Sequence, residues 1–290
     1  MSRRRTRIRP ARVILGAVAV VVSCAWIFPV YWMVSSSLLP NTVLMNSKPT
    51  FFPIGGTLAN YEAVLAGGTF WNSLLLSVEV TLGAVFFALL FAFLAALAIS
   101  RFRFRGRRAF ILAILFIQML PAEGLFIAQY RLMRSLGTAT GGVVGLNPVG
   151  LAVLYVAFVI PFTVWMLRGF VAGIPLELEE SAQVDGCTAT GAFFRITLPL
   201  LAPGLVASGV YAFLQGWNEF TMALVVLGQG TEKQTLPLWL RNFLQQSAAR
   251  ETDWGQVMAS STIVAIPVII FFLIVQGRMT SGLVAGAVKG

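Results

Sequence analysis

Long apolar runs separated by short polar segments make up most of this sequence from Val13 onward. A helix needs about 20 consecutive apolar residues (range about 17–25, longer if tilted) to cross the ~30 Å hydrocarbon core of a bilayer, and these runs are from 17 to 28 residues long. Their approximate limits are Val13–Val34, Asn72–Ile99, Ala109–Phe126, Leu151–Leu167, Ala202–Leu227 and Val257–Gln276. The pattern predicts an all-α membrane protein with six transmembrane helices, the first of which is too long for the core of a signal peptide.

Composition and charge agree with this class. Of the 290 residues, 58% are hydrophobic and only 11% are charged, against about 25% charged in a soluble domain. Six arginines lie between residues 3 and 12, and five more lie between residues 101 and 108. With the N-terminus in the cytoplasm, 15 of the 21 Lys and Arg residues fall on the inner side and 6 on the outer side. The positive-inside rule therefore places both termini in the cytoplasm and explains the net charge of +10 without a nucleic-acid partner.

This topology divides the chain into three parts. Residues 1–12 form a basic cytoplasmic N-terminus, and residues 13–276 form a single six-helix transmembrane domain. Residues 277–290 form a short cytoplasmic tail. Within the domain, residues 175–199 are the one polar segment that combines helix signals with a cluster of acids, and they are expected in the cytoplasm.

The segment 175–199 is predicted to contain a short helix that begins after Pro175 and ends at Gly186. A second short helix is expected to end before Pro199. Leu178, Ala182 and Gly186 are four residues apart, which gives the first helix one face of small residues that another protein could approach. Its acids, Glu177, Glu179, Glu180 and Asp185, do not suit an anionic lipid surface, so the pattern favours a protein partner.

Residue types exclude several chemistries for this chain. There is no histidine, and the two cysteines, Cys24 and Cys187, are far apart, so neither a zinc site nor a disulfide framework is indicated. None of the three lysines, Lys48, Lys233 and Lys289, follows a glycine as in a P-loop. We therefore expect a chain that is not an enzyme and holds no metal or nucleotide. An intramembrane enzyme would need an acid pair such as Glu79 with Glu219.

Polar residues inside predicted spans are candidates for a substrate pathway, because ionisable groups are costly there. Glu79 and Glu219 lie toward the outer ends of their spans, where the alternative is that the carboxylates extend to the outer interface or pair with Arg131 or Arg241. Gln118 lies nearer the midplane, three residues before a proline that can kink the helix. The sequence Trp217-Asn218-Glu219-Phe220 combines a flat ring, an amide and an acid, as sugar sites do. Trp217 could equally anchor the helix at the membrane interface.

The residues Glu180-Ser181-Ala182, Gly186 and Ile196-x-Leu198-Pro199 resemble the "EAA" signature of bacterial ABC-importer permeases, with Ser181 in place of alanine as the one departure. Other stretches resemble the carbohydrate branch, specifically its MalG-like permease subunits. They are Arg101-Phe102-Arg103-Phe104-Arg105-Gly106, Ile160-Pro161-Phe162 with Trp165, Leu167 and Arg168, the Trp217–Phe220 stretch and Thr235-Leu236-Pro237.

The resemblance implies the MetI-like fold of Type I importers in a bacterial inner membrane. It implies a second permease subunit, two cytoplasmic ATP-binding subunits that bind ATP and Mg²⁺, and an extracytoplasmic substrate-binding protein. The coupling helix to the ATPase would contain Glu177, Glu179, Glu180, Ser181, Ala182, Asp185 and Gly186. The expected substrate is an oligosaccharide or disaccharide. A polyol, glycerol phosphate or another small solute is the alternative within this architecture, and an ion-coupled secondary transporter is the alternative outside it.

Overall fold

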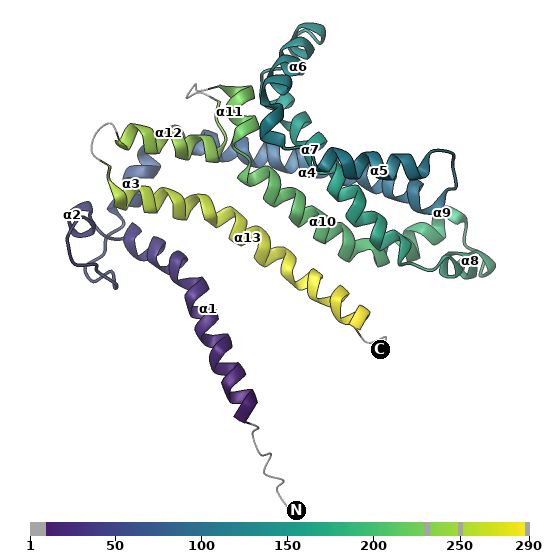
Figure 1. Cartoon of the computed structure of the whole chain (residues 1–290), viewed down its shortest axis with the longest axis horizontal. Coiled ribbons are helices and arrows are strands. Elements are labelled where there is room, and N and C mark those ends of the chain that lie inside the picture. Colours follow the sequence, from purple (N-terminus) through teal and green to yellow (C-terminus); the bar gives the residue numbers. More distant parts are fainter. Residues whose placement is uncertain (1–9, 229–232, 249–251, 288–290) are drawn as a thin grey trace, which may run out of the picture. The chain divides into compact units, whose positions relative to one another are not determined.

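The computed structural model describes residues 10–228, 233–248 and 252–287, and this part of the chain is helical (Figure 1). Within these described residues, five helices are long and apolar enough to cross a membrane: Ile14–Ser37, Phe70–Arg101, Pro148–Ala172, Ala189–Asn218 and Trp254–Gly277. They correspond to five of the six predicted spans and confirm an all-α protein with several membrane-spanning helices. Residues 1–9 of the predicted basic N-terminus and 288–290 of the predicted tail lie outside the described residues.

The helices follow one another in this order: α1 (Pro10–Ser37), α2 (Asn41–Leu44), α3 (Ala59–Ala66), α4 (Phe70–Arg101), α5 (Arg107–Gln118), the 3-10 turn η1 (Ala122–Leu125), α6 (Phe126–Ala139), α7 (Pro148–Ala172), α8 (Leu176–Val184), α9 (Ala189–Ala192), the π-helical turn η2 (Phe193–Thr197), α10 (Leu198–Asn218), α11 (Thr221–Leu227), α12 (Leu236–Ala248) and α13 (Trp254–Ala287). The chain folds into two compact units, 1–67 with 243–265 and 68–242 with 266–290.

The first unit is held together around Asn60. This buried amide, on α3, donates hydrogen bonds of 2.9 Å to the carbonyl oxygens of Ser37 and Leu39 at the end of α1. Gly255 lies against the same atoms, and a Cβ there would be 2.7 Å from the Leu39 oxygen. The start of α13 can therefore approach this junction only because residue 255 has no side chain.

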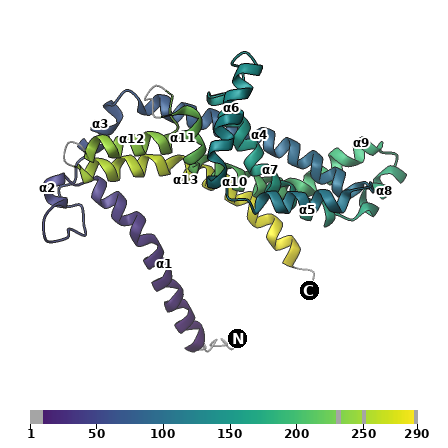
Figure 2. The same ribbon diagram turned by 45° about the horizontal axis from the view of Figure 1, so that its top comes forward.

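The second unit is built on α4, α7 and α10, which lie side by side in both views (Figures 1 and 2). One face of α4 carries an alanine every four residues, and the four side chains are at most 3% exposed. They are Ala84, Ala88, Ala92 and Ala96. Small residues at this spacing let helix backbones approach closely, which increases the van der Waals packing that helps to hold helices together in a bilayer.

The alanine face gives a stability prediction. Ala92 is fully buried in a cluster with Val164 and Leu167 of α7, so Ala92→Phe is expected to destabilise the protein by about 1–3 kcal/mol through overpacking. The thermal unfolding midpoint in detergent should fall relative to the wild type. Leu94→Phe is the matched control, because Leu94 lies two residues on and is 54% exposed. Equal midpoints for the two variants would contradict this account of the helix packing.

The third predicted span, Ala109–Phe126, is wrong as a single helix. Helix α5 ends at Gln118 after 12 residues, about 18 Å of helix, and the chain turns before η1 and α6. The cause is Pro121, which has an extended backbone (φ −68°, ψ 115°) and no N–H to continue a helix. Proline also disfavours helical geometry at the residue before it.

Two further helix ends differ from the predictions. Pro199 does not stop the preceding short helix, because the wider turn of η2 leads directly into α10 and leaves Pro199 in its first turn. The fifth predicted span, Ala202–Leu227, is interrupted after Asn218, where Glu219 takes an extended backbone (ψ 128°). The Glu219 carboxylate then accepts hydrogen bonds from the backbone N–H groups of Met222 (2.7 Å) and Ala223 (3.1 Å), and so caps the new helix α11.

Candidate functional site

The acidic segment forms the helix that its sequence predicts. Helix α8 begins directly after Pro175, carries Glu177 and Glu179 in its first turn and ends before Gly186. Gly186 has a φ of +92°, a left-handed conformation that glycine adopts without strain, and a Cβ there would meet no atom within 4 Å. The predicted start and end of this helix are therefore confirmed. Both views show α8 beyond the ends of α4 and α10 (Figures 1 and 2).

The faces of α8 differ in part from the prediction. Ala182 is only 7% exposed, so the middle of the expected small-residue face is turned into this chain and is not available to a partner. Glu179 is also turned inward and pairs with Arg101. The accessible members of the predicted coupling set are Glu177, Glu180, Ser181, Asp185 and Gly186. Val184, which was not in that set, is the most accessible apolar residue of α8, at 88% exposed.

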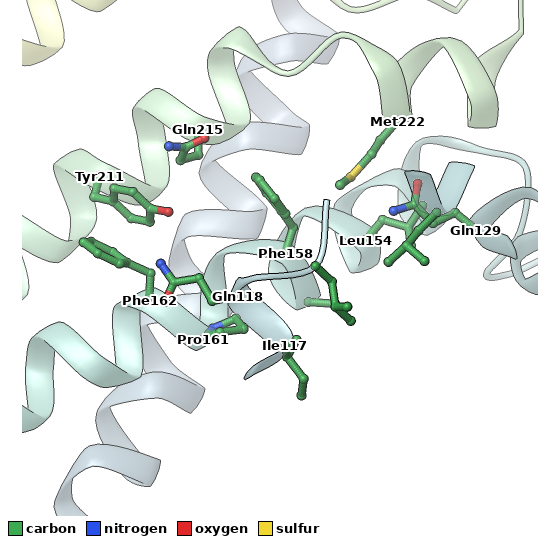
Figure 3. A pocket seen from close by; sticks show the side chains of 13 residues that line it. Ile117, Gln118, Gln129, Leu154, Phe158, Pro161, Phe162, Tyr211, Gln215 and Met222 are labelled. Carbon is green, nitrogen blue, oxygen red and sulfur yellow. The ribbon is translucent and has the colours of Figure 1, made fainter. Parts of the chain in front are cut away.

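A cavity of about 320 Å³ lies in the second unit among α5, α6, α7, α10 and α11. Its lining consists of amides and aromatic rings with aliphatic side chains between them: Gln118, Gln129 and Gln215; Phe158, Phe162 and Tyr211; Ile117, Leu120, Leu125, Leu154, Ala157, Pro161 and Met222. Figure 3 shows the polar ends of Gln118, Tyr211 and Gln215 around one space, next to Phe158 and Phe162. The predicted pathway residue Gln118 thus lies on the cavity wall.

Two features of this wall suit a polar ligand with flat apolar faces. The rings of Phe162 and Tyr211 lie 4.1 Å apart, centroid to centroid, and form an aromatic surface. The side-chain oxygen of Gln129 is buried and has no hydrogen-bond partner among the described residues. Buried polar atoms are normally hydrogen-bonded, so an unpaired one on a cavity wall is available to a ligand or to water.

A second cavity of about 240 Å³ is lined by Phe158, Gln215, Asn218, Glu219, Phe220, Thr221 and Met222. Three of these residues, Phe158, Gln215 and Met222, also line the first cavity. The two cavities therefore adjoin each other. Gln118 of α5 lines the first cavity, and Asn218 and Glu219 at the end of α10 line the second. Three of the five predicted pathway residues are gathered here.

The other two predicted pathway residues lie elsewhere. Trp217 is 2% exposed and stacks on Phe213 with ring centroids 5.5 Å apart, so in this conformation it packs the interior and lines neither cavity. Glu79 is exposed on α4 and lines neither cavity. Within the described residues Glu79 forms no ion pair, so the alternative partners Arg131 and Arg241 are not in contact with it.

Several wall residues were missed by the sequence analysis, among them Tyr211 and Gln215. A signal for them existed, because Tyr211, Gln215 and Glu219 are four residues apart in an otherwise apolar run and so share one helix face. Phe158 and Phe162 gave no such signal, since they are apolar residues within an apolar run. Among the described residues no group of three His, Cys, Asp or Glu side chains could hold a metal ion.

A solved structure supports the fold. The chain superposes on a subunit of a bacterial ABC transporter involved in the import of the acidic polysaccharide alginate, with a TM-score of 0.74 and 24% sequence identity. The match covers 94% of this chain and 99% of that chain, which establishes a shared fold.

Curated relatives resemble the chain over nearly its whole length. The diacetylchitobiose uptake permease DasC of Streptomyces coelicolor is 41% identical, over 96% of this chain and 98% of its own. The trehalose permease SugB of Mycobacterium tuberculosis is 33% identical, over 91% and 93%. The trehalose/maltose permease MalG of Thermococcus litoralis is 31% identical, over 96% of each chain.

A family model for a binding-protein-dependent transport system inner membrane component matches residues 88–283, which include the cavities and α8. That match spans more than half of the chain and agrees with the resemblance carried by Glu180, Gly186 and Pro199. The chain is an integral inner-membrane protein and belongs to the ABC-importer permease family of binding-protein-dependent transport systems.

Proposed function

We propose that this chain is a permease subunit of an ATP-driven importer for an oligosaccharide or disaccharide and forms half of its translocation pathway. The observation that carries the proposal is the pair of adjoining cavities walled by amides and aromatic rings. Aromatic faces suit the C–H surfaces of a sugar ring, and amides can both donate to and accept from hydroxyl groups. The named substrates of DasC, SugB and MalG-type relatives, all sugars, support the same class.

The charge of the cavity walls supports a sugar over glycerol phosphate. Among the described residues, neither wall contains a lysine or an arginine, although phosphate sites normally rely on these residues. The charged residue among the described lining residues is Glu219, which would repel a phosphate. A neutral polyol remains compatible with the same walls and is separated from a sugar by the transport assay described below.

The energy for transport comes, in this proposal, from two partner ATPase subunits that bind ATP and Mg²⁺. Helix α8 is the element that they contact, through the exposed carboxylates of Glu177 and Glu180 and the exposed side chain of Val184.

The segment from α5 to α6 completes a sixth crossing, which puts both termini in the cytoplasm together with α8. A second permease subunit forms the other half of the pathway, and an extracytoplasmic binding protein delivers the substrate.

The first experiment is to purify the tagged chain from its native membrane in mild detergent and identify what accompanies it. A second permease, an ATPase and a binding protein should be recovered together. In proteoliposomes that complex should take up an oligosaccharide or disaccharide only with ATP and with the loaded binding protein, and should not take up a free polyol. Uptake by this chain alone, driven by an ion gradient, would replace the proposal with a secondary transporter.

A further inference from the structure

One side chain attaches helix α8 to the body of its unit. The Glu179 carboxylate accepts a hydrogen bond of 2.7 Å from Nη2 of Arg101, and its same oxygen, Oε1, accepts another of 2.7 Å from the Thr197 hydroxyl. Arg101 is the last residue of α4, and Thr197 is the last residue of η2, directly before α10. Glu179 therefore joins α8 to the end of α4, 78 residues away in sequence, and to the π-helical turn that leads into α10.

The Arg101 guanidinium also holds the chain on the other side of Pro175. Its Nη1 donates a hydrogen bond of 3.4 Å to the carbonyl oxygen of Ile174, which precedes the proline, while Nη2 binds Glu179 within α8. The planar guanidinium can make both contacts at once because its donors have a fixed geometry, which a lysine ammonium lacks. Arg101 thus spans the turn that connects α7 to α8.

These contacts are largely shielded from water. The side chains of Arg101 and Glu179 are 16% and 20% exposed, and Thr197 is fully buried. An ion pair in such a position is weakened less by solvent and salt than a surface pair, and removing one partner leaves the other charge uncompensated. Glu177 and Glu180, in contrast, are exposed and form no ion pair among the described residues.

The π-helical turn η2 places the Thr197 hydroxyl in this arrangement. Residues Phe193–Thr197 have the wider π geometry between α9 and α10, and such turns often occur at functional positions in helices. From Thr197 the chain continues along α10 to Tyr211 and Gln215, which line the cavities. Helix α8 is therefore connected to the cavity wall through Thr197 and the continuous helix α10.

We propose that Arg101, Glu179 and Thr197 form a clamp that makes α8 move as one body with the ends of α4 and α10. A force applied to α8 then moves the helices around the cavities instead of bending the loop at Pro175. This role rests on the proposed function, because the force is supplied by a partner ATPase. All three are positioning residues, and the exposed carboxylates are left for the contact with that partner.

The clamp is tested with Glu179→Gln, Arg101→Gln and the double variant Arg101→Met/Glu179→Met. Arg108→Gln is the matched control, since Arg108 is an exposed arginine in the same segment. Spin labels at Val184 of α8 and Leu200 of α10, both exposed, report the attachment in the full chain with Cys24 and Cys187 replaced by serine. Uptake per ATP hydrolysed and co-purification of the ATPase are measured in the reconstituted complex with the unlabelled variants, which keep Val184.

We expect a narrow distance distribution in the wild type and in Arg108→Gln, and a broad one in the three clamp variants. The ATPase should still co-purify with these variants, while uptake per ATP falls by about tenfold, within the usual range of coupling between sites. The double variant should be no worse than either single variant, because all three variants lose the Arg101–Glu179 ion pair and only the single variants leave an unpaired charge behind.

Unchanged distance distributions in the clamp variants would overturn the proposal, and so would broad distributions with normal uptake per ATP. A loss of uptake without broadening would show a direct contact with the ATPase and would also overturn the clamp. If the wild-type chain binds no ATPase at all, the proposed function fails. The distance distributions then decide the clamp separately, because they need only this chain.

Discussion

Gly186→Trp is expected to reduce ATP-driven uptake by at least about tenfold while the variant chain still reaches the membrane. Gly186 ends α8 with a φ of +92°, and open space surrounds the position where a side chain would begin. A non-glycine residue in this left-handed conformation costs about 1–2 kcal/mol, and the indole would project from the surface that we assign to the ATPase. We expect uptake to fall by at least about tenfold, since a coupling energy of 1–3 kcal/mol corresponds to 5–150-fold.

Two substitutions at the same position separate backbone strain from bulk. Asparagine tolerates the left-handed conformation better than other residues, so Gly186→Asn should retain most of the ATPase association and uptake. Gly186→Ala introduces strain with almost no bulk and should fall between the two. ATPase recovery during purification and uptake in proteoliposomes are the two measurements. Normal ATPase recovery and normal uptake in Gly186→Trp would show that α8 is not the docking element.

Element type and the main spans could be predicted from the sequence because they depend on local properties. The run from Asn72 to Ile99 is long and apolar, and only a helix satisfies its backbone groups inside a membrane. The ends of α8 followed from Pro175 and Gly186, each of which has a specific backbone preference. Pro121 likewise carried the signal for the break after α5, although the prediction read it only as a kink.

The arrangement of side chains depended on contacts between distant parts of the chain, and a single sequence does not reveal these. Glu179 looks like its neighbours Glu177 and Glu180, but its partner Arg101 lies 78 residues away. Glu219 was expected to face a pathway as a charge within a helix. It does line a cavity, but its carboxylate also caps α11. Helix α10 ends just before it, at Asn218, where the sequence suggested one continuous helix.

Trp217 and Gln215 show, within one helix, that the sequence alone does not reveal which side chains line a cavity. They are two residues apart on α10, so they point to different sides, and only the packing of α10 decides which side faces the cavity. Trp217 packs on Phe213 in the interior, and Gln215 lines both cavities. A sequence pattern that suggests sugar binding can thus point to a helix end beside a cavity without showing which of its side chains line that cavity.

The double variant Gln118→Ala/Gln215→Ala is expected to reduce maximal sugar uptake strongly without loss of the ATPase. Both amides face the same space on the cavity wall (Figure 3). A hydrogen bond to a neutral partner contributes about 0.5–1.5 kcal/mol, so each loss should slow uptake by about two- to tenfold. Uptake rates measured with a saturating concentration of loaded binding protein should fall by the product of these two factors. Tyr211→Phe, which keeps the ring beside Phe162, tests the hydroxyl alone.

Leu214→Ala is the matched control, because Leu214 lies next to Gln215 on α10 but is exposed and lines neither cavity. It should transport at the wild-type rate. Glu219→Ala is a less direct test, since it also removes the cap of α11, and Glu219→Gln keeps one acceptor for the Met222 N–H. If the amide variants transport normally and retain the ATPase, the cavities are gaps in the packing, and the pathway must lie on another face of this subunit.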